Sequence, residues 1–214
     1  NITVLVAAHS EFILTVSCVE QGRWNHVSPN FQATHYAPPG LRGKKNASVR
    51  RNRAQRGTYE SDQGEVWADV SERLSAMRCE SRTDSLTEGL EAQRAKSDEY
   101  RAALELPDGC AGVIIETRGR PVGIELFDCP GTMLKLWPRL SQGYFLEATR
   151  NSDTHCPANA PEVETLIGDI AEHLVPVDNP KGLGIELEVD AFGMAGAGVY
   201  HEGRLVHLAA FSPH

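Results

Sequence analysis

Apolar and polar positions in the first quarter of the chain predict two strands followed by an irregular region. Residues 2–7 and 12–19 are short runs rich in apolar and β-branched residues, the pattern of strands. Residues 21–58 show no clear hydrophobic period and contain Pro29, Pro38, Pro39, Gly40 and Gly43. We therefore expect a long irregular connection there, and a connection of that length is uncommon unless it is functional or disordered.

Two helices are predicted next. Asp62 is suited to cap the first, with Glu65 three residues later to complete a capping box. The apolar positions at helical spacing that follow are Val66, Trp67, Val70, Leu74 and Met77, which define one buried face. The second helix is predicted over residues 84–106, ends before Pro107, and has a weaker apolar face typical of a surface helix.

The second half of the chain alternates hairpins and helices. One hairpin is predicted over residues 111–127, and residues 132–149 form a helical segment that Pro138 should kink or divide. A further helix is expected over residues 161–174, a strand over 183–189, and a closing hairpin over 197–211. Strands and helices in blocks predict a single α+β domain over residues 1–214, with a mixed or antiparallel sheet and about four helices.

Length and composition narrow the class of protein without naming a function. The 214 residues are 41% hydrophobic and 23% charged, ordinary values for a globular domain with a real core. No apolar run approaches the roughly 18 residues that a membrane helix needs. Integral membrane, collagen-like, coiled-coil and globally disordered proteins are therefore excluded, whereas an enzyme, a binding module and a structural domain all remain.

The cysteines bear on the cellular compartment, and the first residues bear on whether the domain begins before this sequence. Five cysteines, an odd number without a C-x-x-C pair, indicate neither a disulfide framework nor a zinc knuckle. Reduced thiols predict a cytoplasmic protein. The chain starts at Asn1 and enters a strand-like run at once, so we expect that the N-terminal part of the domain is missing.

Charge is unevenly spread along the chain. Residues 1–59 carry a net charge of +6 and residues 60–214 a net charge of −14, for a total of −8. The basic cluster at residues 42–56 could hold phosphate or nucleic acid electrostatically. We favour a solvated loop that packs near the acidic remainder, because no aromatic residues interleave the charges. A nucleic-acid partner is therefore not expected.

The densest group of chemically useful side chains is residues 16–24, with sequence Val-Ser-Cys-Val-Glu-Gln-Gly-Arg-Trp. In a regular strand Cys18 and Glu20 share one face, and Gly22 permits a sharp turn or a positive φ that re-aims Arg23 and Trp24. Arg23 can fork onto a carboxylate or phosphate, and Trp24 offers a stacking plane. The alternative is a structural knot, with Glu20 paired to Arg23, and with Cys18 and Trp24 in the core.

Other candidate chemistry is weaker. His155 adjoins Cys156 without a second ligand pair, and His201 and His207 flank a hairpin turn where they could face each other. The glycine-rich residues 193–198 lead into a strand instead of opening a helix, so they do not indicate a phosphate loop. Glu186 and Glu188 alternate along one strand, which is typical of a solvated face. We predict no metal and no cofactor.

Three elements together resemble a known family. They are residues 16–24, the later Asp62-Gln63-x-x-Val66-Trp67, and Gly-x-Glu-Leu-Phe at residues 123–127. The chain resembles the ARG (ADP-ribosylglycohydrolase) and rhodanese-phosphatase-superfamily-associated protein domain family over residues 1–150 and onward to the end. The resemblance implies further sequence before the first strand, including a Gly-Ala-Lys-Gln-Asn-Arg-like stretch absent here. It points toward NAD, ADP-ribose or phosphate metabolism and identifies no catalytic residue.

Three functional hypotheses follow. The first is a binding or accessory module for a small anionic or nucleotide-like ligand, or for a protein partner. Its predicted ligand-binding residues are Glu20, Arg23, Trp24, Gln63 and Trp67. The second is a hydrolase-type enzyme in which Cys18 is the nucleophile or Glu20 the acid/base, with Arg23 stabilising an anion. The third is a structural domain of a larger assembly.

Overall fold

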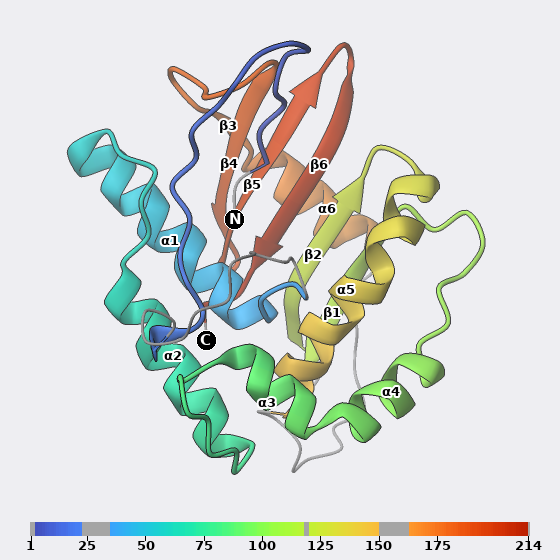
Figure 1. Ribbon diagram of the computed structural model, residues 1–214. Coiled ribbons are helices and arrows are strands. Elements are labelled where there is room, and N and C mark those ends of the chain that lie inside the picture. Colours follow the sequence, from blue (N-terminus) through green and yellow to red (C-terminus); the bar gives the residue numbers. More distant parts are fainter. Residues whose placement is uncertain (1–2, 23–34, 118–119, 150–162, 214) are drawn as a thin grey trace.

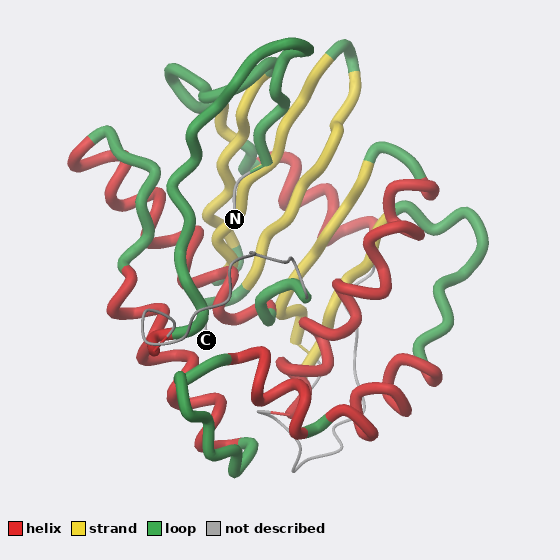
Figure 2. The backbone as a smooth tube through the Cα atoms, viewed as in Figure 1, coloured by secondary structure: helices red, strands yellow, loops and turns green. Residues whose placement is uncertain are grey.

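A computed structural model of the chain describes residues 3–22, 35–117, 120–149 and 163–213. These residues form six helices and six strands (Figures 1 and 2). The helices are α1 (Pro39–Arg56), α2 (Gln63–Ala76), α3 (Leu86–Ala92), α4 (Arg94–Ala103), α5 (Pro130–Ala148) and α6 (Val163–Glu172). The strands are β1 (Gly112–Thr117), β2 (Arg120–Phe127), β3 (Val175–Pro176), β4 (Ile185–Ala191), β5 (Met194–His201) and β6 (Arg204–Phe211).

The strands form one sheet in the order β1-β2-β6-β5-β4-β3, and every pairing is antiparallel. Helices α1 and α5 lie against one face, and α6 lies behind the other (Figure 1). Side chains alternate along β2, so Glu125 points to the α1 face while Ile124 joins Ile170 of α6 in the core behind the sheet. The prediction of an α+β fold with a largely hairpin-built sheet is confirmed.

Helix α1 corrects the prediction of a long irregular connection. Its buried positions are mostly small or polar, which leaves no apolar stripe in the sequence. Small side chains let α1 lie close to the sheet: a Cβ at Gly43 would be 2.7 Å from the carbonyl oxygens of Phe211 and Ser212. Ala195 of β5 accepts a hydrogen bond from Asn46 at 3.3 Å. Close packing of small residues against the sheet therefore stabilises α1, although its sequence shows no hydrophobic period.

The two strands predicted at the N-terminus are wrong in the described residues. Residues 3–22, here called the N-terminal strap, start beside the sheet, rise to a turn at residues 7–10, and then descend past α1 to α2 without forming a strand of the sheet (Figures 1 and 2). Two isolated bridges, Leu5 to Leu183 and Glu20 to Ser85, are their strand-like contacts. A segment rich in β-branched residues becomes a strand only where a neighbouring strand can form backbone hydrogen bonds with it. The helix α1 has no free backbone groups along the path of the strap.

The helix predictions hold with two adjustments. Asp62 caps α2 by accepting from the backbone N–H groups of Gly64 and Glu65, at 2.9 and 3.1 Å. The predicted α2 face is buried except for half-buried Trp67. The helix predicted over 84–106 is broken at Gln93 into α3 and α4. Pro138 does not divide α5.

Candidate functional site

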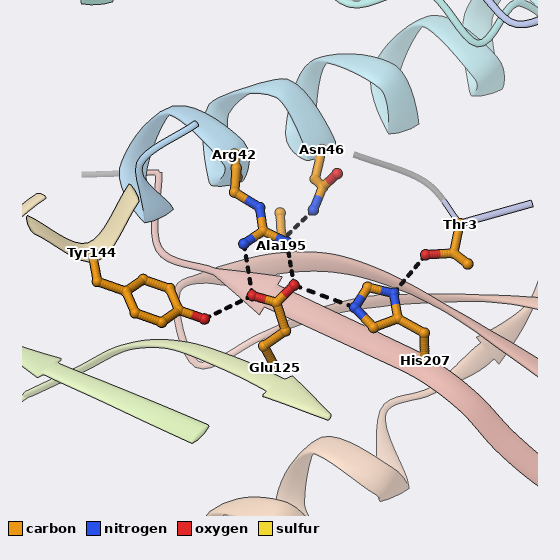
Figure 3. A network of polar contacts seen from close by, with 7 residues as sticks. All are labelled: Thr3, Arg42, Asn46, Glu125, Tyr144, Ala195 and His207. Atoms are coloured by element: carbon orange, nitrogen blue, oxygen red, sulfur yellow. Dashed lines mark hydrogen bonds and ion pairs between the residues drawn. The ribbon is translucent and has the colours of Figure 1, made fainter. Parts of the chain in front are cut away.

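A buried polar network holds α1 on the sheet (Figure 3). Arg42, in the first turns of α1, donates from both terminal nitrogens to the two carboxylate oxygens of Glu125 on β2, each at 2.7 Å. Both side chains are at most 2% exposed. The Tyr144 hydroxyl of α5 donates to the same carboxylate at 2.9 Å, and His207 Nε2 lies 3.3 Å from Oε1. On its other nitrogen, His207 contacts the hydroxyl of Thr3 at 2.5 Å.

The charges in this network are mutually satisfied. Burial alone would raise the pKa of Glu125, but the charge and hydrogen bonds of Arg42, helped by His207, lower it to about 2. Burial and the Glu125 carboxylate raise the pKa of Tyr144 well above its ordinary value, so the hydroxyl stays a donor. The guanidinium also lies 4.0 Å above the ring of Phe211. Each charged side chain of this network has a partner within the protein, so we interpret the network as a structural clamp that holds α1 on the sheet.

The remaining charges of α1 are largely neutralised by acidic side chains of α2 and β4. The ion pairs are Lys44 with Asp69, Arg50 with Asp190, Arg51 with Glu65, and Arg53 with Glu186 and Glu188. The basic cluster therefore packs against acidic residues, as expected, but as a helix rather than a loop. Glu186 is only 4% exposed, so the prediction that Glu186 and Glu188 form a solvated face is wrong for Glu186.

A cavity of about 840 Å³ lies between the N-terminal strap, α1 and the segment that leads into α2. We call it the strap cavity. Val16 and Val19 of the strap and Val49 of α1 form part of its apolar wall, and the rings of Tyr36 and Tyr59 line it as well. The wall also carries polar side chains, among them His35, Glu60 and Gln63. An apolar surface with convergent polar groups is typical of small-molecule sites.

Lys45 is the cation of the strap cavity. It follows Arg42 by one helical turn and lines the cavity beside Val49. Within the described parts of the chain its ammonium group has neither an ion pair nor a hydrogen bond, in contrast to the neighbouring Lys44. Burial, with a further contribution from the positive charge of Arg42, lowers the pKa of Lys45. A largely buried cation without a counter-ion among the described residues is suited to an anion from outside the chain.

The predicted site residues Cys18, Glu20 and Gln63 hold the strap against the helices. Gln63 binds the Cys18 backbone twice: its Oε1 accepts from the N–H at 3.0 Å, and its Nε2 donates to the carbonyl oxygen at 2.8 Å. The Cys18 thiol donates to the carbonyl oxygen of Glu20 at 3.1 Å, and the Glu20 carboxylate accepts from Thr83 at 2.9 Å. Gly22 is required for close approach, since a Cβ there would lie 2.8 Å from Cα of Thr83.

The other predicted site residues lie elsewhere. Arg23 and Trp24 fall outside the described residues. Trp67 is half-buried on α2, does not line the strap cavity, and has an indole N–H without a hydrogen-bond partner among the described residues. Gln63 is thus the one predicted ligand-binding residue that the described structure brings to the cavity wall.

Sequence reasoning missed the network and the cavity cation. Glu125 was visible as a carboxylate between apolar residues of a strand, a signal of a buried partner. The prediction that His201 and His207 could face each other is wrong, because His201 is opposite Arg204 and His207 is opposite Val199. The bulge between Val199 and Tyr200 shifts this register. Lys45 was hidden among seven other basic residues of the N-terminal region.

Searches for other kinds of site gave three findings on the described residues. No group of three or more His, Cys, Asp or Glu side chains there is arranged to hold a metal ion. None of the helices in that part of the chain is long and apolar enough to cross a membrane. Cys18, Cys79, Cys110 and Cys129 are free thiols, while His155 and Cys156 lie outside the described residues.

Comparison with known proteins gives one relationship. Neither the curated proteins nor the solved structures gave a significant match. A family model does match, over residues 1–211, and its description names an association with ARG and rhodanese-phosphatase superfamily proteins. That range includes the strap, the clamp and every residue of the strap cavity. The chain therefore belongs to the ARG and Rhodanese-Phosphatase-superfamily-associated Protein domain family, ARPP-1.

Proposed function

We propose that this domain is a binding or accessory module that holds a small anionic ligand in the strap cavity, with Lys45 as the partner of the anion. One observation carries the proposal: a largely buried ammonium group without a counter-ion among the described residues faces a cavity large enough for a small molecule. Every other cation of α1 from Arg42 to Arg53 has an acidic partner. An incoming anion would satisfy the remaining one.

The walls of the cavity favour a ligand with an apolar or aromatic part beside its charge. Tyr36 and Tyr59 offer ring surfaces, and the valines add apolar area. A nucleotide-like ligand has this combination. The family name records an association with ADP-ribosylglycohydrolase proteins, which makes ADP-ribose and NAD the first compounds to test. A cytoplasmic setting, as predicted from the thiols, would supply both.

Arg23 and Trp24 extend this proposal. They follow directly on the anchored end of the strap, and Gln63 connects that end to the cavity wall. We propose that Glu20, Arg23, Trp24, Gln63 and Trp67 form or support the approach to the ligand. The enzyme hypothesis retains its own test, a Cys18→Ser variant. The thiol donates to a backbone carbonyl and not to a base, which favours the binding module.

The test is calorimetric and thermal-shift titration with phosphate, ADP-ribose and NAD. A ligand at one hundred times its dissociation constant stabilises the fold by about 2.7 kcal/mol, a readable shift in melting temperature. Lys45→Met should weaken binding about tenfold or more, because a charge-assisted contact is lost. Lys135→Met is the matched control, since Lys135 is exposed on α5, away from the cavity. Equal affinity of the Lys45→Met and Lys135→Met variants would refute the assignment of Lys45.

A further inference from the structure

Lys45 has the surroundings of a reactive amine as well as those of an anion partner. Its side chain is largely buried, lines the strap cavity, and has neither an ion pair nor a hydrogen bond within the described structure. Its neighbour Lys44, on the same helix, is engaged by Asp69, to which it donates at 2.6 Å. A lysine attacks a carbonyl carbon only as the neutral amine, so these two lysines differ in their availability for reaction.

Two features of α1 make the neutral form of Lys45 available. The side chain is removed from water, and the positive charge of Arg42 lies one turn away; together they lower the pKa of the amine. Desolvation and an adjacent cation are the two means by which proteins activate a lysine for imine formation. Arg42 is itself fixed by Glu125 on its far side, so its position beside Lys45 does not depend on a flexible side chain.

We propose that Lys45 forms a Schiff base with an aldehyde or ketone group of a small anion bound in the strap cavity. This inference rests on the proposed function, since the same cavity and cation receive the anion. The substrate class is therefore a carbonyl compound with a carboxylate or phosphate group. Neither a metal nor an oxidant is required.

The reaction is balanced within the cavity. The amine nitrogen adds to the carbonyl carbon to form a carbinolamine, and the carbon–oxygen bond then breaks as the carbon–nitrogen double bond forms. The oxygen leaves as water with the two protons that the amine has lost, and protonation of the imine nitrogen restores a positive charge at Lys45. Tyr36 lines the same cavity, and burial raises the pKa of its hydroxyl, so the hydroxyl stays protonated and can relay one of these protons, giving one to the departing oxygen and regaining one from the amine nitrogen.

The test is reductive trapping with glyoxylate, a small anionic aldehyde, and borohydride, followed by peptide mapping of the whole chain. We expect Lys45 to be the main modified lysine and to be labelled several-fold faster than the exposed lysines, since burial lowers its pKa and so raises the fraction of neutral amine. Lys96 and Lys135 are the internal controls, because both are exposed. Labelling should increase with pH along a curve shifted to lower pH than that of Nα-acetyl-lysine. Labelling spread evenly over the lysines would overturn the inference.

Lys45→Arg tests whether position 45 is the labelled one. Arginine does not form this imine, so the variant should lose trapping at position 45, and the proposed function is tested separately by phosphate binding to the native chain. If the native chain binds phosphate yet glyoxylate does not trap Lys45, the Schiff base is refuted and anion binding stands. If Lys45 is trapped as readily by neutral acetone as by glyoxylate and phosphate does not bind, the amine is reactive and the anion site is refuted. Circular dichroism confirms the fold of each variant.

Discussion

The buried pair of Arg42 and Glu125 makes the stability of this domain depend on acid in a predictable way. The pKa of Glu125 falls from 4.5 to about 2 in the folded chain. At about 1.4 kcal/mol per pKa unit, ionised Glu125 contributes about 3 kcal/mol to the free energy of unfolding at neutral pH. Because the folded pKa is the lower one, this contribution is complete above pH 4.5 and is lost as pH falls toward 2. About two fifths of it remains at pH 3.

The perturbation is Glu125→Gln. Removing one partner of a buried ion pair leaves Arg42 without its counter-charge, so we expect a loss of about 3–5 kcal/mol at pH 7. The difference between native protein and variant should shrink by about 2 kcal/mol between pH 7 and pH 3, because at pH 3 the Glu125 carboxyl is protonated in the unfolded chain but still ionised in the folded one. Urea unfolding followed by circular dichroism at both pH values measures both effects.

A matched control is the exposed ion pair that joins α1 to α2. Arg51 and Glu65 form an ion pair at 3.1 Å with both side chains about half exposed. Glu65→Gln should cost at most about 1 kcal/mol, with little dependence on pH. If Glu125→Gln costs no more than Glu65→Gln, or if its effect is the same at pH 3 as at pH 7, the reasoning about the clamp is wrong. If Glu125→Gln does not fold, the double variant Arg42→Met with Glu125→Leu should restore folding, since it removes both charges.

Three further predictions concern other parts of the fold. Gly43→Ala should lower the free energy of unfolding by about 2 kcal/mol or more, because its methyl group would overlap backbone oxygen atoms of residues 211 and 212. Gly168→Ala, at an exposed position of α6, should raise the free energy of unfolding by about 0.5–1 kcal/mol. Chemical denaturation that ranks the two variants the other way would contradict the packing of α1. Asp62→Ala should cost about 1 kcal/mol through the lost cap of α2, and an unchanged urea midpoint would argue against that cap. Lys45→Met should raise the melting temperature at neutral pH by removing an unpaired buried charge. The pKa of Lys45 is lower in the folded chain than in the unfolded chain, so the charged lysine destabilises the fold below the folded pKa, and this destabilisation is relieved as pH rises through it. The stabilisation by Lys45→Met should therefore shrink toward pH 10, and a stabilisation that grows toward pH 10 would contradict this reasoning.

Sequence patterns predicted those elements whose reason is local. The α2 face from Val66 to Met77 buries large apolar side chains at helical spacing, and the cap at Asp62 is formed by its own backbone neighbours. The hairpins could be read because each strand pairs with the next one along the chain. Helix α1 could not, because its buried face consists of residues such as Gly43 and Ser48, whose role is set by the backbone they approach.

The sequence predicted residues at the wall of the strap cavity but not the cation inside it, because the role of that cation also depends on tertiary packing. Residues 16–24 stood out by composition, and those of them that the structure describes fix the strap that closes the cavity. The cation inside it could not be distinguished in sequence from its neighbours. Lys44 and Lys45 are adjacent and chemically identical, and only the course of α1 gives one of them Asp69 and the other the cavity.

The place of β6 in the sheet has a consequence for biosynthesis. The last strand of the domain, Arg204–Phe211, lies between β2 and β5, so it joins two halves that otherwise share no strand pairing. During translation the β1–β2 and β4–β5 hairpins can emerge and form, but the sheet stays in two pieces until β6 has left the ribosome. Until then the nascent chain exposes the unpaired edges of β2 and β5, and loss of β6 would leave both edges open to aggregation.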